Sequence, residues 1–172
     1  MGKPGNKVVI VDENDTPIGV KLYEDMKYDD IYRVTALWLT DTLTGDALLA
    51  QRKWTKRNDP GKWACAVGGT IEEGDTYDDN IVKEIEEEIG LTGLSLTRGP
   101  KQFVDNEAHK FFCQWFIASV DKNKVELTLE EDEVAQVKWL PPEELITDVE
   151  AHPEKYTPNT KESLQILGVA ER

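Results

Sequence analysis

The stretch from residue 69 to residue 91, GTIEEGDTYDDNIVKEIEEEIGL, is the most informative part of this chain. It opens on a glycine, continues into a helical pattern and contains three carboxylates, Glu84, Glu87 and Glu88, near its end. Residues three and four apart share one face of a helix, so these carboxylates are predicted to project together. Carboxylates held this close repel each other unless a cation lies between them. Mg²⁺ prefers oxygen ligands and in proteins commonly also binds the phosphates of a substrate. The stretch therefore predicts metal-assisted chemistry on a phosphorylated substrate.

A solvated acidic helix is the plainer interpretation, because glutamate forms helices well and acidic helix faces are often only hydrated. The charge pattern argues against it. From Glu72 to Glu88 the chain carries nine acidic residues and one basic residue, Lys83. A stable surface helix usually interleaves opposite charges at four-residue spacing, which this stretch does very little. The pattern favours a functional role for the acids.

The same stretch resembles the signature of the Nudix hydrolase family. That signature reads Gly, five residues, Glu, seven residues, Arg-Glu, an aliphatic residue, any residue, Glu-Glu, any residue, Gly and an aliphatic residue. All spacings match over 23 residues. Asp75 stands where Glu is usual and Lys83 where Arg is usual, so both departures keep the charge. A match over so many positions is a specific signal. The other matching positions are Gly69, Glu84, Ile85, Glu87, Glu88, Gly90 and Leu91.

The resemblance implies a mechanism and the residues that perform it. Glu84, Glu87 and Glu88 would bind catalytic Mg²⁺ (or Mn²⁺), and one of them would serve as general base. Metal-activated water would then attack a diphosphate linkage, because a bound metal lowers the pKa of its water and neutralises phosphate charge. The family also implies a further metal-binding acid near Glu131 or Glu133, where a solvated acidic turn is an equal alternative.

Both departures from the signature change the local chemistry. Lys83 is a point charge and cannot reproduce the bidentate fork of arginine, so it would orient the glutamates less firmly. Asp75 is one methylene shorter than Glu, which shifts any contact that it makes. Upstream, Arg52, Lys53 and Lys56 belong to a basic loop that is predicted to contact substrate phosphates. Ordinary surface lysines and arginines are the equal alternative.

The composition indicates one soluble globular domain, 1–172. A formal net charge of −14 argues against a nucleic-acid polymer or an anionic membrane as partner. No apolar run approaches the ~20 residues that span a bilayer, and the N-terminus lacks a signal-peptide core. Cys65 and Cys113 are predicted to be buried free thiols in a cytoplasmic protein.

One helix dominates the secondary-structure pattern. Thr76 is a plausible N-cap with Asp79 as its capping-box partner, and Gly90 suits the C-cap. A stripe at helical spacing is predicted to pack inward; it comprises Tyr77, Ile81, Ile85 and Ile89. A short helix should follow Pro141 and Pro142, and a terminal helix should lie within 156–168.

Strands are predicted to outnumber helices, which indicates an α/β or α+β layered domain. The resemblance implies the Nudix fold, a mixed β-sheet sandwiched between helices, with an N-terminal β-hairpin. We expect a hairpin extension over 1–30, a core over 31–147 and a C-terminal helical extension over 148–172. The predicted strands are Lys7–Val11, Ile18–Leu22, Ile31–Leu39, Ala47–Gln51, Trp63–Val67, Leu94–Thr97, Gln102–Val104, Lys110–Val120 and Ala135–Leu140.

Three further segments resemble the branch of the superfamily that includes isopentenyl-diphosphate isomerase and its hydrolase-like bacterial relatives: VVIVDENDTPIG, PGKWACAVGGTIEEGD and EVAQVKWLPPEEL. The resemblance covers about residues 7 to 168. In the isomerase a catalytic cysteine precedes the signature glycine, and here that position is Gly68. Cys65 lies three residues earlier, which on an alternating strand turns it to the opposite face.

The isomerase also uses histidine metal ligands from its N-terminal half. The histidines of this chain, His109 and His152, lie elsewhere, and Lys27 and Tyr32 stand near the expected places. The isomerase interpretation therefore fails on its chemistry, and a hydrolase on the same scaffold survives.

The resulting prediction is a divalent-metal-dependent hydrolase that cleaves a diphosphate linkage in a nucleoside diphosphate bound to another moiety, or in a similar organic pyrophosphate. A non-catalytic nucleotide or metal sensor is the first alternative, which the intact glutamate triad argues against, and diphosphate isomerisation is the second. The expected partner is a small-molecule diphosphate substrate. The N-terminal hairpin can pair within one chain or across two, so a homodimer stays open.

Overall fold

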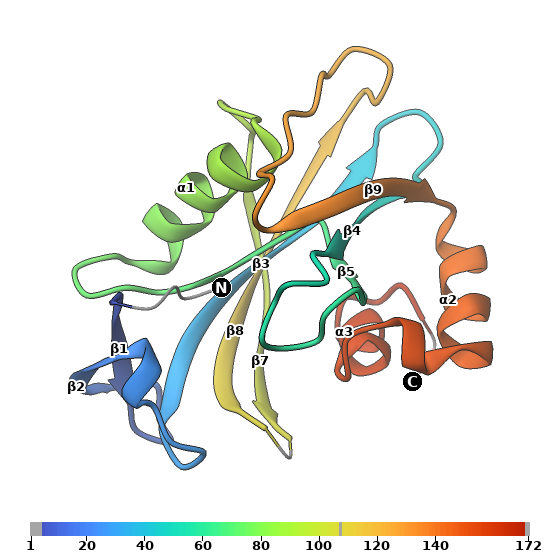
Figure 1. Cartoon of the computed structure of the whole chain (residues 1–172). Helices are drawn as coiled ribbons and strands as arrows, with labels where there is room; N and C mark the ends of the chain where they lie inside the picture. Colours follow the sequence, from blue (N-terminus) through green and yellow to red (C-terminus); the bar gives the residue numbers. More distant parts are fainter. Residues whose placement is uncertain (1–4, 107, 171–172) are drawn as a thin grey trace.

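The computed structural model describes residues 5–106 and 108–170. These residues form one mixed nine-stranded sheet with helices on both of its sides (Figure 1), which confirms the predicted fold class. The strands are β1 (Lys7–Val11), β2 (Pro17–Leu22), β3 (Ile31–Asp41), β4 (Ala47–Arg52), β5 (Trp63–Cys65), β6 (Val67–Thr70), β7 (Thr97–Asp105), β8 (Lys110–Val120) and β9 (Val134–Leu140). The helices are α1 (Tyr77–Ile89), α2 (Pro142–Ala151) and α3 (Thr160–Ile166), with 3₁₀ turns at Tyr23–Asp25 and Pro153–Lys155. None of the helices in the described ranges is both long enough and apolar enough to cross a bilayer.

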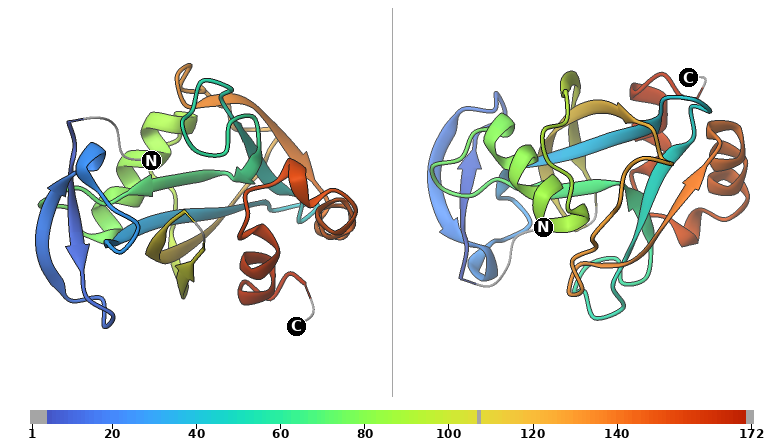
Figure 2. Two further views of the ribbon diagram at one scale, coloured as in Figure 1. Left: turned by 60° about the horizontal axis from the view of Figure 1, so that its bottom comes forward. Right: turned by 90° about the horizontal axis from the view of Figure 1, so that it is seen from above.

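Strand β3 is the centre of the sheet. It pairs antiparallel with β1, β4 and β6 and parallel with β8 along its whole length, from Ile31 to Asp41. Alternate side chains of β3 point to opposite faces. Leu37 and Leu39 join the core under α1, whereas Ala36 and Trp38 join the core under α2 and α3. Figure 2 shows α1 and the C-terminal helices on the two sides of the sheet.

Helix α1 begins and ends where its sequence predicts. The Thr76 side chain accepts a hydrogen bond from the Asp79 backbone N–H, and the Asp79 side chain accepts one from Thr76, so the capping box is complete. Gly90 ends the helix in the left-handed conformation, with φ 72°, which favours glycine. Ile81 and Ile85 are buried in the core, as the helical stripe predicts.

Two predicted strands are wrong in their bounds. Trp63–Val67 is divided at Ala66, because β5 pairs with β4 whereas β6 pairs with β3. The chain thus changes partner strands in the middle of an apolar run. Leu94–Thr97 is not a strand, since β7 begins only at Thr97 and includes the separately predicted Gln102–Val104. Apolar residues of that run pack against the core from a loop instead.

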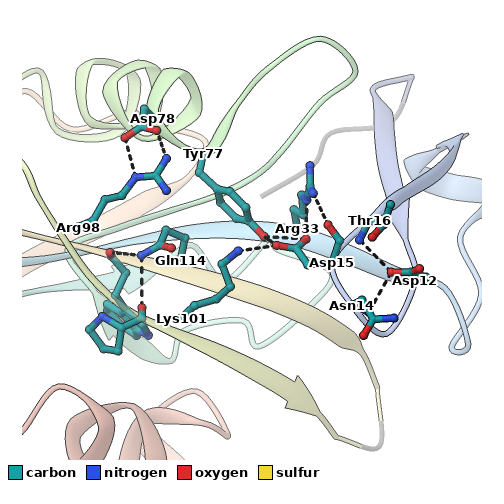
Figure 3. Close-up of polar contacts among 12 residues, drawn as sticks. Asp12, Asn14, Asp15, Thr16, Arg33, Tyr77, Asp78, Arg98, Lys101 and Gln114 are labelled. Carbon is teal, nitrogen blue, oxygen red and sulfur yellow. Dashed lines mark hydrogen bonds and ion pairs between the residues drawn. The ribbon is translucent and has the colours of Figure 1, made fainter.

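Asp15 ties the β1–β2 hairpin to the rest of the domain (Figure 3). Its carboxylate accepts hydrogen bonds from Arg33 Nε at 2.6 Å on β3 and from Lys101 Nζ at 2.5 Å on β7. The Tyr77 hydroxyl at the start of α1 donates to it at 3.1 Å. Burial raises the pKa of Asp15, but the two cations outweigh burial and hold that pKa below its ordinary value. One carboxylate therefore joins three distant elements.

We expect Asp15→Ala to lower the free energy of unfolding at pH 7 by about 2–4 kcal/mol, because the largely buried Arg33 and the more exposed Lys101 would both lose their partner. The control is Asp29→Ala, whose carboxylate is almost fully exposed beside Lys110, and whose loss should cost under about 0.5 kcal/mol. A depressed pKa stabilises the fold at neutral pH, and this contribution disappears as the pH falls through it. Urea unfolding should therefore show the difference between wild type and Asp15→Ala shrinking below about pH 4. Equal stability of the two variants at pH 7 would contradict the role of Asp15.

Candidate active site

Helix α1 places two of its glutamates against β6. Glu84 and Glu88 are one turn apart and are only 9% and 8% exposed, whereas Glu87 is exposed. Glu88 Oε2 accepts a hydrogen bond from the Gly68 backbone N–H at 3.3 Å. Glu84 Oε1 accepts one from Asn80 Nδ2 at 3.2 Å. The helix thus presents a buried carboxylate pair to the strand that precedes it, with the third carboxylate at the surface.

Gly69 is required by the close approach of α1 to β6. A Cβ atom at this position would overlap the carboxyl group of Glu84. Glycine therefore lets the helix lie close enough for the Glu84 carboxylate to rest directly on the strand. This explains in physical terms why a glycine belongs at the start of the 69–91 stretch.

The buried carboxylates are crowded. Burial, together with the negative charges of Glu84 and Glu133, raises the pKa of Glu88 to about 7. Burial also raises the pKa of Glu84, with a smaller contribution from the charge of Glu87. Opposite charge near such carboxylates would favour their ionised form.

Glu133 completes what we call the carboxylate cluster, which consists of Glu84, Glu88 and Glu133. The segment before β9 returns to the end of α1, where the Glu130 backbone N–H donates to the Glu88 carbonyl oxygen at 3.1 Å. Glu133 is buried and lines the same cavity as Glu88, whereas Glu131 is exposed. Of the two acids that the sequence leaves open, Glu133 is the one beside the α1 glutamates.

The carboxylate cluster suits a hard divalent cation in its donor chemistry. It offers oxygen ligands alone, and two of its members are buried with raised pKa values, which a cation would lower. In the conformation described for 5–106 and 108–170, no three His, Cys, Asp or Glu side chains converge closely enough to hold a metal ion. Glu84 and Glu88 would hold Mg²⁺ or Mn²⁺, with Glu87 reaching in from the surface and Glu133 from the β9 side.

The basic loop lies beside this cluster, but its residues differ in what they contact. Arg52 lines the cavity, and its Nε and Nη2 donate to the Asn58 carbonyl oxygen at 3.1 and 2.9 Å. Lys56 Nζ lies 2.6 Å from Glu133 Oε1. Lys53 contacts Glu133 through its backbone, whose N–H donates to the Glu133 carbonyl oxygen at 3.0 Å. All three residues predicted to bind substrate therefore lie close to the carboxylate cluster.

The two departures from the 69–91 signature both contact Glu72, and the charge of Lys83 partly offsets the rise that burial causes in the pKa of Glu84. Lys83 Nζ is 3.9 Å from Glu72 Oε2 in a largely exposed ion pair. Asp75 lies in the turn before α1, where its backbone N–H donates to the Glu72 carbonyl oxygen at 3.1 Å. The direct contacts of the two buried carboxylates come instead from Asn80 and Gly68.

A cavity of about 180 Å³ opens beside Glu88 and Glu133. Side chains of β3, β7 and β8 and the C-terminal segment from Thr157 to Leu167 line it. Its aromatic lining residues are Tyr32, Trp38, Phe111 and Trp115. We did not predict from the sequence that the C-terminal segment belongs to the site. The three-residue spacing of Leu164 and Leu167, both facing the cavity, is the signal that could have indicated it.

The expectation that Cys65 is turned to the opposite face from Gly68 is wrong. Cys65 and Gly68 line the same cavity, and a Cβ atom at Gly68 would stand 3.9 Å from Cys65 Sγ. The alternation expected for a continuous strand fails because the strand is broken at Ala66. Burial, with a smaller contribution from the charge of Glu88, raises the pKa of the Cys65 thiol to about 12, so the thiol stays protonated. Cys65 and the buried Cys113 are both free thiols, as predicted, although Cys65 is only partly buried.

The two histidines differ in position. His109 lines the cavity near its Tyr32 end, and burial lowers its pKa. His152 follows α2 and is exposed. Among the hydrogen bonds and ion pairs of the described residues, none joins either histidine to the carboxylate cluster.

Known proteins resemble the chain in sequence and in fold. A model of the family described as NUDIX domain matches residues 31–160. An uncharacterised Nudix hydrolase of Pseudomonas aeruginosa is 26% identical over 156 residues, which covers 91% of this chain and 89% of that protein. An isopentenyl-diphosphate Δ-isomerase of Kocuria rhizophila is 28% identical over 167 residues, covering 88% of this chain and 87% of the isomerase. A crystal structure of a Deinococcus radiodurans protein superimposes with a TM-score of 0.82 at 20% identity, covering 94% of this chain and 98% of that one.

Proposed function

The chain belongs to the NUDIX domain family, and from that premise we propose that it hydrolyses a diphosphate linkage in a small organic substrate with the help of a divalent metal ion. The observation that carries the proposal is the buried pair of Glu84 and Glu88, which faces the Gly68–Gly69 strand beside a cavity. Burying two like charges costs stability unless a cation offsets them. A catalytic divalent ion is a reason to retain both.

Each residue of the site has its own role in the proposed hydrolysis. When bound, Mg²⁺ or Mn²⁺ supplies a water of lowered pKa and neutralises charge on the phosphates. Gly69 lets Glu84 approach the strand, and the Gly68 backbone N–H orients Glu88. Glu88 lies beside the cavity, where it would bind the metal ion or act as general base. Arg52 contributes positive charge where the cavity meets the carboxylate cluster, as binding of a phosphate requires.

The substrate is a nucleoside diphosphate linked to another moiety, or a similar organic pyrophosphate. The aromatic and aliphatic walls of the cavity support this, because they can pack against the part of the substrate that lies beyond the phosphates. A non-catalytic nucleotide or metal sensor is less well supported, since a binder gains little from burying Glu88 beside the charges of Glu84 and Glu133.

Diphosphate isomerisation is a second candidate, and one observation favours it. The protonated thiol of Cys65 faces the cavity beside Glu88, close to the position of Gly68. A thiol and a carboxylate could add and remove protons on a hydrocarbon. Hydrolysis remains the better proposal, because the thiol is not at the position that the isomerase resemblance requires and His109 and His152 are outside the carboxylate cluster.

A substrate panel tests the proposal. Nucleotide sugars, dinucleotides, nucleoside triphosphates and isoprenoid diphosphates are incubated with the protein and Mg²⁺, and the products are separated by ion-exchange chromatography. We expect cleaved phosphate-containing products from one substrate class, and we expect EDTA to abolish them. Rearranged but uncleaved diphosphate would favour the isomerase, and binding without turnover across the panel would favour the sensor.

A further inference from the structure

We propose that Lys56 is an internal counter-ion of the carboxylate cluster, which holds Glu133 until a divalent cation takes its place. On release, the Lys56 ammonium becomes available to a phosphate of the substrate. The inference rests on the proposed function, because it assumes that Glu84, Glu88 and Glu133 surround the metal. It makes Lys56 a positioning residue that links metal binding to the loop between β4 and β5.

The contact itself is short and shielded from solvent. Lys56 Nζ lies 2.6 Å from Glu133 Oε1, and the two side chains are 18% and 7% exposed. Charges in such surroundings are screened far less than surface charges. Either partner left alone there would be a poorly solvated charge, so each needs a replacement ion when the pair opens.

The position of the pair beside the carboxylate cluster would give each partner a replacement ion, a divalent cation for Glu133 and a substrate phosphate for Lys56. Glu133 lines the cavity together with Glu88, and the charges of the two carboxylates act on each other. A divalent cation between them offsets more negative charge than one ammonium does. A substrate phosphate beside the cluster would in turn accept the freed ammonium, because lysine binds phosphate as a point charge. Glu133 thus exchanges Lys56 for the metal ion, and Lys56 exchanges Glu133 for the substrate phosphate.

The loop that carries Lys56 is coupled to the cavity. Arg52, the last residue of β4, and Asp59 of this loop line the cavity, and Arg52 donates to the Asn58 carbonyl oxygen. The Lys53 backbone N–H fastens the start of the loop to the Glu133 carbonyl oxygen at 3.0 Å. Lys56 therefore lies between two residues that line the cavity, and its side chain can move while the main-chain attachment at Lys53 persists.

Binding of Mn²⁺ alone, followed by electron paramagnetic resonance and calorimetry, tests the proposal without any turnover. We expect Lys56→Met to bind Mn²⁺ about five- to tenfold more tightly than wild type, because a competing cation has been removed. Lys56→Arg keeps the charge and should stay within about twofold of wild type. The control Lys62→Met removes a lysine of the same loop whose Nζ lies 3.1 Å from Asp59 Oδ1, and it should leave the affinity unchanged.

Two further experiments distinguish a failure of the counter-ion role from a failure of the metal site. In a Glu133→Gln background, Lys56→Met should no longer tighten Mn²⁺ binding, because its partner has gone. In the wild type, the side-chain ¹⁵N signal of Lys56, assigned by its loss in Lys56→Arg, should shift on Mg²⁺ addition while that of Lys62 does not. Equal or weaker Mn²⁺ binding by folded Lys56→Met, or an unmoved Lys56 signal in a metal-binding wild type, overturns the counter-ion role. Failure of the wild type and every variant to bind Mn²⁺ overturns the metal site of the proposed function, and the counter-ion role with it.

Discussion

Replacing Glu88 by glutamine is expected to lower kcat by about 10²–10³-fold, because the amide keeps the shape of the side chain but neither bears a charge nor accepts a proton. Glu88 is buried, receives the Gly68 N–H and lies beside Glu84. The proposed metal and base functions both depend on it. The measurement is kcat with the best substrate of the panel, at saturating Mg²⁺.

The same variant has a predicted stability signature. The folded-state pKa of Glu88, about 7, lies above its ordinary value, so ionisation disfavours the folded state. In EDTA, wild-type stability should therefore fall as the pH rises from about 4.3 to 7 and then level off. Glu88→Gln lacks this loss and should be roughly 2–4 kcal/mol more stable than wild type at pH 8, but not at pH 4.

The matched control is Glu86→Gln, which removes an exposed carboxylate from the same helix. It should change neither kcat nor the pH dependence of unfolding by more than a small amount. Wild-type turnover by folded Glu88→Gln would contradict the placement of the site. A pH dependence of stability in Glu88→Gln equal to that of wild type would contradict the buried, crowded state of the carboxylate.

Replacing Gly69 by alanine is the second change with a large expected effect. The new methyl group would overlap the Glu84 carboxyl, so that side chain must leave its place on β6. A shift of about 1 Å in a catalytic group typically costs about 10²-fold, and we expect kcat to fall by about 10- to 100-fold. The free energy of unfolding should fall by less than about 2 kcal/mol, because the displaced group is the end of a flexible side chain.

Gly19→Ala is the control for Gly69→Ala. A Cβ atom at Gly19 meets no other atom within 4 Å, so the change tests the loss of a glycine without a collision. If Gly69 acts through Glu84, then Gly69→Ala in a Glu84→Gln background should cost far less activity than it does alone. Full additivity of the two changes, or wild-type kcat in Gly69→Ala, would show that Gly69 does not position Glu84.

The features that sequence predicts well here are local. The capping box of Thr76 and Asp79 and the left-handed Gly90 depend on residues within one or two turns. The inward stripe of α1 follows from helical period alone. The same period brings Glu84 and Glu88 to one side, although burial separates them from Glu87 and the sequence did not predict that difference.

The features that sequence could not predict depend on contacts between distant segments. The break at Ala66 arises because two strands, β4 and β3, pair with successive halves of one apolar run. The Lys56–Glu133 ion pair joins residues 77 positions apart, and no local pattern indicates it. The wall that the 157–167 segment gives to the cavity likewise exists only once α3 packs against the sheet.

One reaction in H₂¹⁸O, with Mg²⁺ and the best substrate of the panel and analysed by mass spectrometry, tests whether the protein is a hydrolase. Attack of water on a diphosphate linkage predicts one ¹⁸O atom in a phosphate-containing product, abolished in Glu88→Gln. A rearranged diphosphate without ¹⁸O in its phosphates, or a substrate recovered unchanged from a protein that binds it, would contradict the assignment of this chain as a hydrolase.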